Sequence, residues 1–296
     1  MENPEPLIRW PQPILEYLGF LAAFLSAGAI GFRFGVLRPL RRDSAAEPGL
    51  PPLLDTAARR AAMWGLAGAT LAVALMSYNL PQQAARRHVE VGQFVTGNPL
   101  VAAQVILALV ALVGFALARG NKFGWPLAAI AVIGSPLRGA FVGQWTRLVN
   151  PVHELAGGLW IGSLFVMLAA GLSTVLASPL PTERRGALAA RMVNAFSPLA
   201  LGSAAVLATF GVITAVRHVK HVANLWQTPY GITFLIKLVA VLGVASLGAW
   251  NWRRVKPRLG SEEGAKTLRR SATTEVVVAA IVLAITAVLV SLPDTP

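Results

Sequence analysis

Residues 150–172, NPVHELAGGLWIGSLFVMLAAGL, form a long apolar run that opens with a histidine beside a carboxylate. Asn150 and Pro151 predict a helix start here, because Asn accepts backbone N–H groups at an N-cap and Pro fits the first helical turn. Steps of three and four residues then predict one shared helix face. That face carries His153, Gly157, Trp160, Leu164, Met167 and Gly171.

Long apolar runs of this kind recur along the whole chain, which has 296 residues, 55% of them hydrophobic and 13% charged. A hydrocarbon core of about 30 Å needs roughly 20 apolar residues per helix. The sequence therefore predicts an all-α, polytopic membrane protein of about eight transmembrane helices. We expect them near 13–37, 60–78, 99–118, 124–143, 151–177, 197–217, 229–252 and 274–291. We divide them into two four-helix halves, residues 1–150 and 151–296.

Basic residues sort by side of the membrane. Alternate loops carry seventeen Lys and Arg on one face and six on the other. The positive-inside rule makes the richer face cytoplasmic, so both termini are expected on the outer, periplasmic side. The N-terminal segment has two glutamates and no basic region, so we expect no cleaved signal peptide. We infer a multi-pass protein of a bacterial inner membrane.

The net charge of +13 does not indicate a nucleic-acid partner, because the concentration of Lys and Arg in the loops of one side explains it. The lipid bilayer is the expected partner of the apolar surface. The chain has no cysteine, which excludes disulfides and thiolate metal sites. No nucleophile and base constellation is visible, so we do not expect an enzyme.

Two ionisable residues fall within predicted membrane helices. Arg138 follows Ser135–Pro136 in the outer half of the fourth helix, and Lys237 lies about midway along the seventh. An intramembrane charge is a functional-site hypothesis by default. For Arg138 the alternative is a structural role, in which it reaches the outer interface or pairs with Glu154 or Glu16.

All four histidines are expected at the outer side: His88, His153, His218 and His221. Imidazole suits copper and Met thioether favours Cu(I), so His153, His218 and His221 with Met76 would make an outward metal site. The alternative is that these histidines are polar residues at wet helix ends, and Arg217 and Lys220 would repel a cation from His218 and His221.

Small residues on the 151–177 helix have a packing interpretation. Gly158 and Gly162 form a small-xxx-small pair that lets helices approach closely. Trp160 lies about two turns below the helix start. We expect a buried packing role for it near His153.

Several ordered blocks resemble the copper resistance protein D (CopD-like) membrane family. HELAGGLWIGSL is similar to that family's H-x-x-x-x-x-x-W-x-G helix, and FSPLALGSAAVLATFGVITA to its sixth-helix block. TPYGITFLIKL is similar to a Y-G-x-x-x-x-x-K block, and TEVVVAAIVLAITAVLVSLP to the closing helix. The resemblance runs from about His153 to Pro293, and the first half agrees mainly in helix count.

The resemblance implies copper uptake across the inner membrane or copper tolerance, often beside periplasmic copper-binding partners. It also implies functional positions at His153, Trp160, Tyr230, Gly231, Lys237 and Glu275. Two blocks depart from the family pattern. Many relatives carry a fourth-helix histidine where this chain reads GSPLR at 134–138, and the usual Thr-Gly of helix 6 is Phe210–Gly211.

The sequence supports three alternative hypotheses for the function. The first is a copper-handling protein that accepts copper outside and passes it inward, with His153 as the receiving ligand. The second is a metal-free structural or assembly subunit of a larger respiratory or photosynthetic membrane complex. The third is a b-type cytochrome with haem between His153 and His218. Haem ligation needs two rings at matched depth, so we rank haem last.

Overall fold

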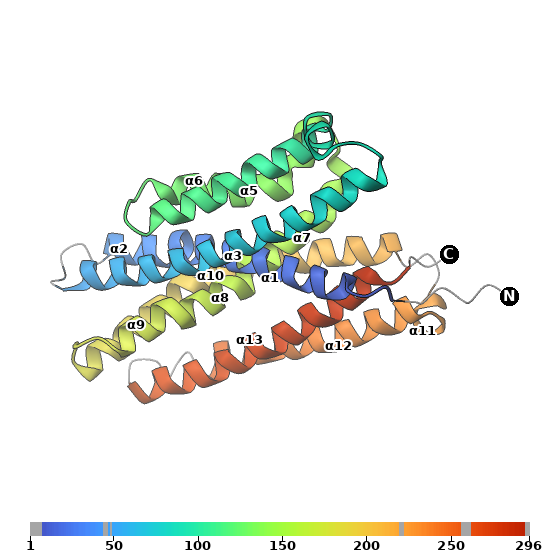
Figure 1. The fold of residues 1–296 in the computed structure, drawn as a ribbon. Helices are drawn as coiled ribbons and strands as arrows, with labels where there is room; N and C mark the ends of the chain where they lie inside the picture. The colour runs from blue at the N-terminus through green and yellow to red at the C-terminus, as the bar shows by residue number, and fades with distance from the viewer. Residues whose placement is uncertain (1–7, 44–46, 48, 219–221, 256–261, 294–296) are drawn as a thin grey trace.

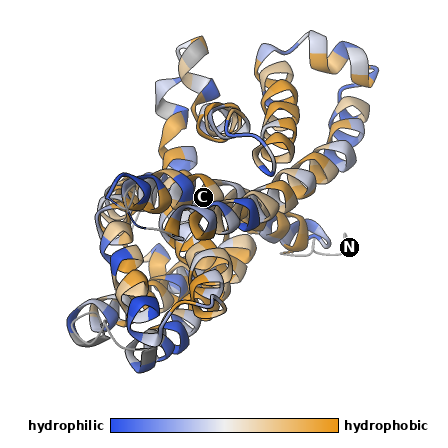
Figure 2. Cartoon of the chain, turned by 90° about the vertical axis from the view of Figure 1, so that its left-hand side faces the viewer, coloured by the Kyte–Doolittle hydropathy of each residue, from blue (hydrophilic) through white to orange (hydrophobic). Residues whose placement is uncertain are grey.

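The computed structural model describes residues 8–43, 47, 49–218, 222–255 and 262–293. These residues form helices and no strands, which confirms the all-α prediction (Figure 1). Seven helical segments are long and apolar enough to cross a membrane, and hydrophobic residues cover much of the helices' length (Figure 2). The chain is a multi-pass membrane protein.

The first three predicted spans follow the sequence closely at their apolar centres. The first consists of α1 (Gln12–Gly31), the π-helical η1 (Phe32–Leu37) and α2 (Arg38–Asp43). The second is α3 (Leu50–Arg86), which begins ten residues before the predicted span because Pro51 and Pro52 fit a first helical turn. The short α4 (Val91–Thr96) leads to α5 (Pro99–Ala118). Asn98 caps α5, since its side chain accepts hydrogen bonds from the N–H groups of Leu100 and Val101.

The fourth predicted span is a composite. α6 (Gly124–Leu137) has 14 residues, which rise about 21 Å. The chain continues as two 3₁₀ turns, η2 (Arg138–Val142) and η3 (Trp145–Leu148). α6 is therefore not among the seven long apolar helices, although it runs back antiparallel beside α5 (Figure 1). Pro136, which cannot donate a backbone hydrogen bond, lies directly before this change of helix type.

The fifth span is central and irregular. It comprises α7 (Val149–Gly157), the π-helical η4 (Gly158–Gly162), α8 (Ser163–Val166), the π-helical η5 (Met167–Leu172) and α9 (Ser173–Leu176). The predicted cap is wrong, because the helix begins at Val149 and the Asn150 side chain accepts a hydrogen bond from Thr214 at 2.9 Å instead.

The last three spans form the C-terminal part. α10 (Thr182–His218) begins before the predicted span and keeps Pro198 in its interior. The short α11 (Asn224–Gln227) precedes α12 (Pro229–Trp250), which Thr228 caps by accepting a hydrogen bond from the N–H of Gly231. The π-helical η6 (Asn251–Val255) ends this span, and α13 (Glu262–Ser291) follows it.

α1 lies in the middle of the bundle, packed against α3, η4, α8 and α13. The fifth span crosses it so closely that a Cβ atom on Gly162 would lie 2.1 Å from the backbone oxygen of Phe24. A Cβ atom on Gly28 would lie 2.3 Å from the Gly162 backbone in turn. This confirms the packing role predicted for the small-residue pair. Because α1 contacts η4 and α13, the two predicted halves pack together, and the division at residue 150 stays a prediction.

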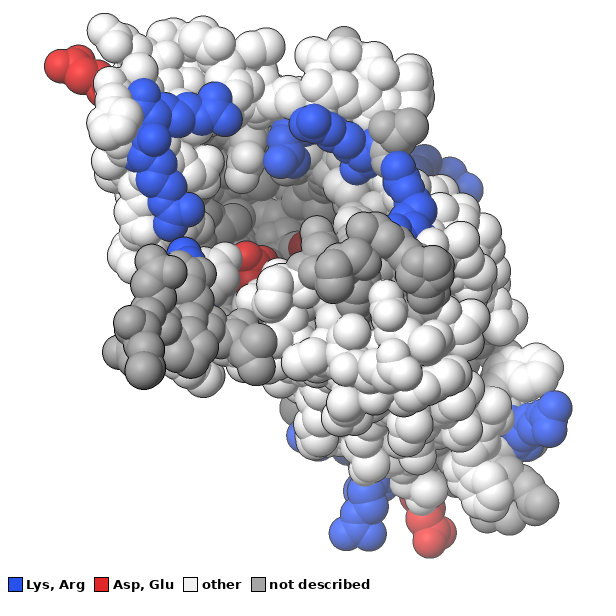
Figure 3. Space-filling view, turned by 90° about the vertical axis from the view of Figure 1, so that its right-hand side faces the viewer, with Lys and Arg blue, Asp and Glu red and all other residues white. Residues whose placement is uncertain are grey.

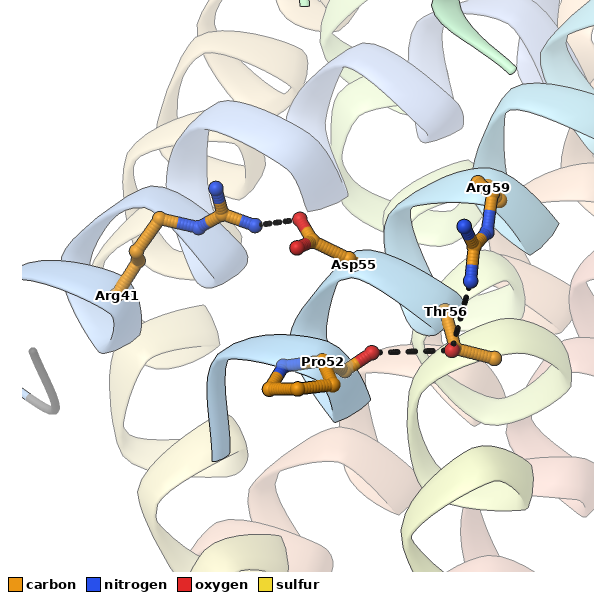
Figure 4. Close-up of polar contacts among 5 residues, drawn as sticks. All are labelled: Arg41, Pro52, Asp55, Thr56 and Arg59. Carbon is orange, nitrogen blue, oxygen red and sulfur yellow. Dashed lines mark hydrogen bonds and ion pairs between the residues drawn. The ribbon is translucent and has the colours of Figure 1, made fainter. Parts of the chain in front are cut away.

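Polar contacts join neighbouring helices near an end of the bundle. α1 begins and α13 ends at one end (Figure 1), which we call the outer end. At the opposite end Arg41 of α2 pairs with Asp55 of α3, and Arg59 donates to Thr56 at 3.2 Å (Figure 4). Arg60 donates to Thr174 at 3.0 Å and so joins α3 to α9. These contacts tie the inner ends of the first, second and fifth spans together.

Candidate functional site

His153 lies in the second turn of α7, half-buried against α10. Its Nδ1 atom is 2.9 Å from the backbone oxygen of Leu207. A carbonyl oxygen only accepts, so Nδ1 carries the proton and donates. In the neutral ring Nε2 then keeps its lone pair. This is the arrangement by which metal-binding histidines are commonly oriented, with one ring nitrogen held by a carbonyl and the other offered to the metal.

Gly211 makes room for this imidazole. A Cβ atom at that position would lie 3.0 Å from Cε1 and 3.4 Å from Nδ1 of His153, which is tighter than ordinary contact. The neighbouring hydrogen bond from Thr214 to Asn150 joins the same two helices one turn further out. α10 thus forms a backbone cradle for the ring, and the Phe210–Gly211 block that departs from the family pattern keeps the glycine on which this depends.

Lys237 of α12 lies near enough for its charge to act on His153. Its side chain is half-buried, and no hydrogen bond or ion pair to another described residue is formed by it. Two positions singled out by the resemblance, His153 and Lys237, are therefore brought towards one another from the fifth and seventh spans. The sequence places them 84 residues apart and gives no signal of this proximity.

Trp160 lies in η4 and packs, half-buried, against the hydrophobic core. Leu164 and Met167 are buried in the same core. Gly157 meets Phe24 and Leu207, whereas Gly171 meets Phe32 and Met192. The predicted face thus lies against the first span and α10 at both its outer and its inner part, as the sequence spacing predicts.

The other predicted metal ligands lie apart from this histidine where the structure describes them. Met76 lines an outer cavity that His153 does not line. His218 ends α10; its side chain, like the whole of His221, lies outside the described residues. His88 is exposed in the turn after α3. Within the described ranges, no three His, Asp or Glu residues are grouped as a metal site would require. The four-ligand site stays a prediction.

Arg138 lines the same outer cavity as Met76, at the point where α6 becomes η2. Its guanidinium donates to the Ser135 backbone oxygen at 2.7 Å and to Gln104 Oε1 at 3.3 Å. Glu16 and Glu154 line this cavity too. Neither carboxylate forms a salt bridge with Arg138, although the charges of Arg138 and Glu154 act on one another. The three residues for which pairing was predicted therefore line one cavity, but no salt bridge forms between them.

A buried polar network lies between η6 and α13, and only part of it was predicted. Glu275 is 4% exposed, and its Oε2 accepts from Nδ2 of Asn251 at 3.0 Å. Ser271 donates to Oδ1 of Asn251. The sequence analysis identified Glu275 but missed Asn251 and Ser271. The sequence signal for Asn251 was its position as a polar residue at the end of an apolar helix, four residues beyond Leu247.

Tyr230 and Gly231 form the first turn of α12. A Cβ atom on Gly231 would lie 2.0 Å from the backbone oxygen of Asn224, so the glycine allows α11 to lie against this turn. Tyr230 is half-buried beside it. The block identified by resemblance therefore shapes the outer end of the seventh span.

The comparisons with known proteins give a family match in the C-terminal part of the chain. Residues 190–289 match the copper resistance protein D family, covering most of α10, all of α12 and most of α13. The HELAGGLWIGSL block lies before the matched range. No curated protein and no solved structure gives a match. The chain is a multi-pass membrane protein whose residues 190–289 are similar to the copper resistance protein D family.

Proposed function

We propose that this protein accepts copper from the periplasmic side of a bacterial inner membrane and passes it towards the cytoplasm, with His153 as the receiving ligand. The observation that carries the proposal is the Nδ1–H contact to Leu207, which orients the ring and leaves the Nε2 lone pair for a metal. Copper is here the transported substrate. A periplasmic copper-binding protein is the natural donor.

Lys237 lowers the affinity of this site for a cation, and transport requires such a moderate affinity. A cation at His153 would be opposed by the ammonium group whose charge acts on the ring. A conducting site must bind an ion well enough to admit it and weakly enough to release it. His153 and Lys237 together meet this condition for inward passage.

The first test is the copper content of protein purified in mild detergent from copper-supplemented cells. We expect near-stoichiometric copper in the wild type and its loss in His153→Ala. His88→Ala is the matched control, because His88 is an exposed histidine on a loop. Equal copper in wild type and His153→Ala, or none in the wild type, contradicts the proposal.

Direction is tested separately in sealed vesicles. Right-side-out vesicles containing the protein should accumulate radioactive copper supplied outside. Inverted vesicles should accumulate less, and His153→Ala should reduce uptake to the level of vesicles without the protein. The opposite preference would reverse the proposed direction.

A metal-free subunit of a larger membrane complex is the second candidate. The observation in its favour is the exposure of α10 and α12, of which only 6% of the most apolar window is buried in each case. Such faces suit lipid or neighbouring membrane proteins equally. Stable co-purification with defined partners, in samples without copper, would favour this function over transport.

A further inference from the structure

The outer cavity has a volume of about 450 Å³ and is lined from α1, α3, α5, α6 and α7. Figure 3 shows the molecule hollowed at its outer end, with acidic atoms visible inside the hollow. Three charged residues line the cavity, Glu16, Arg138 and Glu154. Its remaining polar lining consists of uncharged amides and hydroxyls, including Asn79, Gln83 and Gln104, together with the thioether of Met76.

The charges in this cavity do not balance. Two carboxylates face one guanidinium, and Arg138 directs its N–H groups to Ser135 and Gln104 instead of either carboxylate. An uncompensated charge among apolar helices is costly, because surrounding protein solvates it poorly. One further positive charge would neutralise the group.

Glu154 is the group that lacks a partner. Its side chain points into the cavity and is largely enclosed by protein. Among the described residues it receives no hydrogen bond and no ion pair. Glu16, across the cavity on α1, already accepts a hydrogen bond from Gln12 and adds a like charge. Both carboxylates therefore favour the arrival of a cation between them.

The donors present here select the kind of cation. Carboxylate and amide oxygens are hard ligands that suit alkali-metal and alkaline-earth ions, whereas Cu(I) prefers thioether and imidazole. The cavity is also large enough for an ion that keeps part of its hydration shell, since one water needs about 30 Å³. A single uncompensated negative charge calls for a monovalent cation.

We propose that the outer cavity binds one monovalent metal cation, a sodium ion from the periplasmic side, between Glu16 and Glu154. This site is separate from the copper-receiving histidine, and its existence does not depend on copper transport. Arg138 neutralises the charge of one of the two carboxylates. The remaining net charge is balanced by a monovalent cation.

The test is the thermal stability of the purified full chain in detergent, in sodium chloride and in choline chloride of equal ionic strength. A cation that binds only the folded state raises Tm by mass action. If sodium is the occupant, Tm rises by a few degrees in sodium chloride alone.

The response to sodium should disappear in Glu154→Gln and Glu16→Gln, which preserve side-chain size. It should persist in Glu90→Gln, an exposed carboxylate outside the cavity. Size-exclusion profiles confirm that each variant is folded. Persistence of the response in Glu154→Gln, or no response to sodium in the wild type, overturns the proposal.

Arg138→Gln provides an independent arm. Removing the guanidinium leaves two uncompensated carboxylates, so calcium should now stabilise the protein more than sodium does. An unchanged preference for the monovalent cation overturns the charge balance on which the proposal rests. His153→Ala should keep the wild-type response, which separates failure of this site from failure of copper binding.

Discussion

The imidazole of His153 rests against the backbone of α10 at Gly211, where an added Cβ atom would come within 3.0 Å of Cε1. The hydrogen bond to Leu207 depends on this close approach, because the ring must lie flat enough on the helix to reach a backbone oxygen. The ring's orientation is therefore decided by a residue without a side chain.

Gly211→Val should displace the ring and weaken copper binding. Loss of an orienting contact to a metal-binding histidine typically costs about 10-fold to 100-fold in affinity. Copper titration of the purified protein measures it. Gly202→Val is the control, since an added Cβ atom there meets nothing within 4 Å. Equal affinities for the two variants would mean that Gly211 does not position His153.

Gly162→Ala should destabilise the bundle. Its new methyl group would meet the Phe24 backbone at 2.1 Å, so α1 and the fifth span must separate. Overpacking of this kind costs about 1 to 3 kcal/mol. Unfolding in detergent reports the change in free energy. Gly19→Ala, on α1 with open space around it, should leave stability nearly unchanged. A tolerant Gly162 would contradict the close crossing.

Glu275→Leu should cost about 1 to 3 kcal/mol, because Nδ2 of Asn251 loses its acceptor in a buried setting. Glu275→Gln keeps an acceptor oxygen and should cost less. Thr273→Val on the exposed side of α13 is the control. Unfolding of the three variants in detergent ranks them. If Leu is tolerated as well as Gln, the network does not stabilise the helix pair.

The absence of cysteine gives a clean test of topology. Gly92→Cys in α4 and Arg147→Cys in η3 should react with a membrane-impermeant maleimide added outside intact spheroplasts. Gly120→Cys, between α5 and α6, should react only after permeabilisation. Labelling of positions 120 and 147 from the same side would show that α6 does not cross the membrane.

The sequence alone determined the helical class and the apolar centres of the spans. Backbone groups in lipid must be satisfied within each segment, so a run such as 99–118 identifies α5 without knowledge of its neighbours. Local caps were equally readable at Asn98 and Thr228, since a capping side chain reaches only two or three residues along the chain.

The tertiary structure decided the sites. The sequence predicts Asn150 as a helix cap, yet its side chain accepts a hydrogen bond from Thr214, 64 residues away. The cradle of His153 needs a carbonyl and a glycine of α10. The outer cavity collects Glu16, Arg138 and Glu154 from three separate segments. Periodicity assigns residues to faces of one helix, but which faces meet depends on the crossing of whole helices.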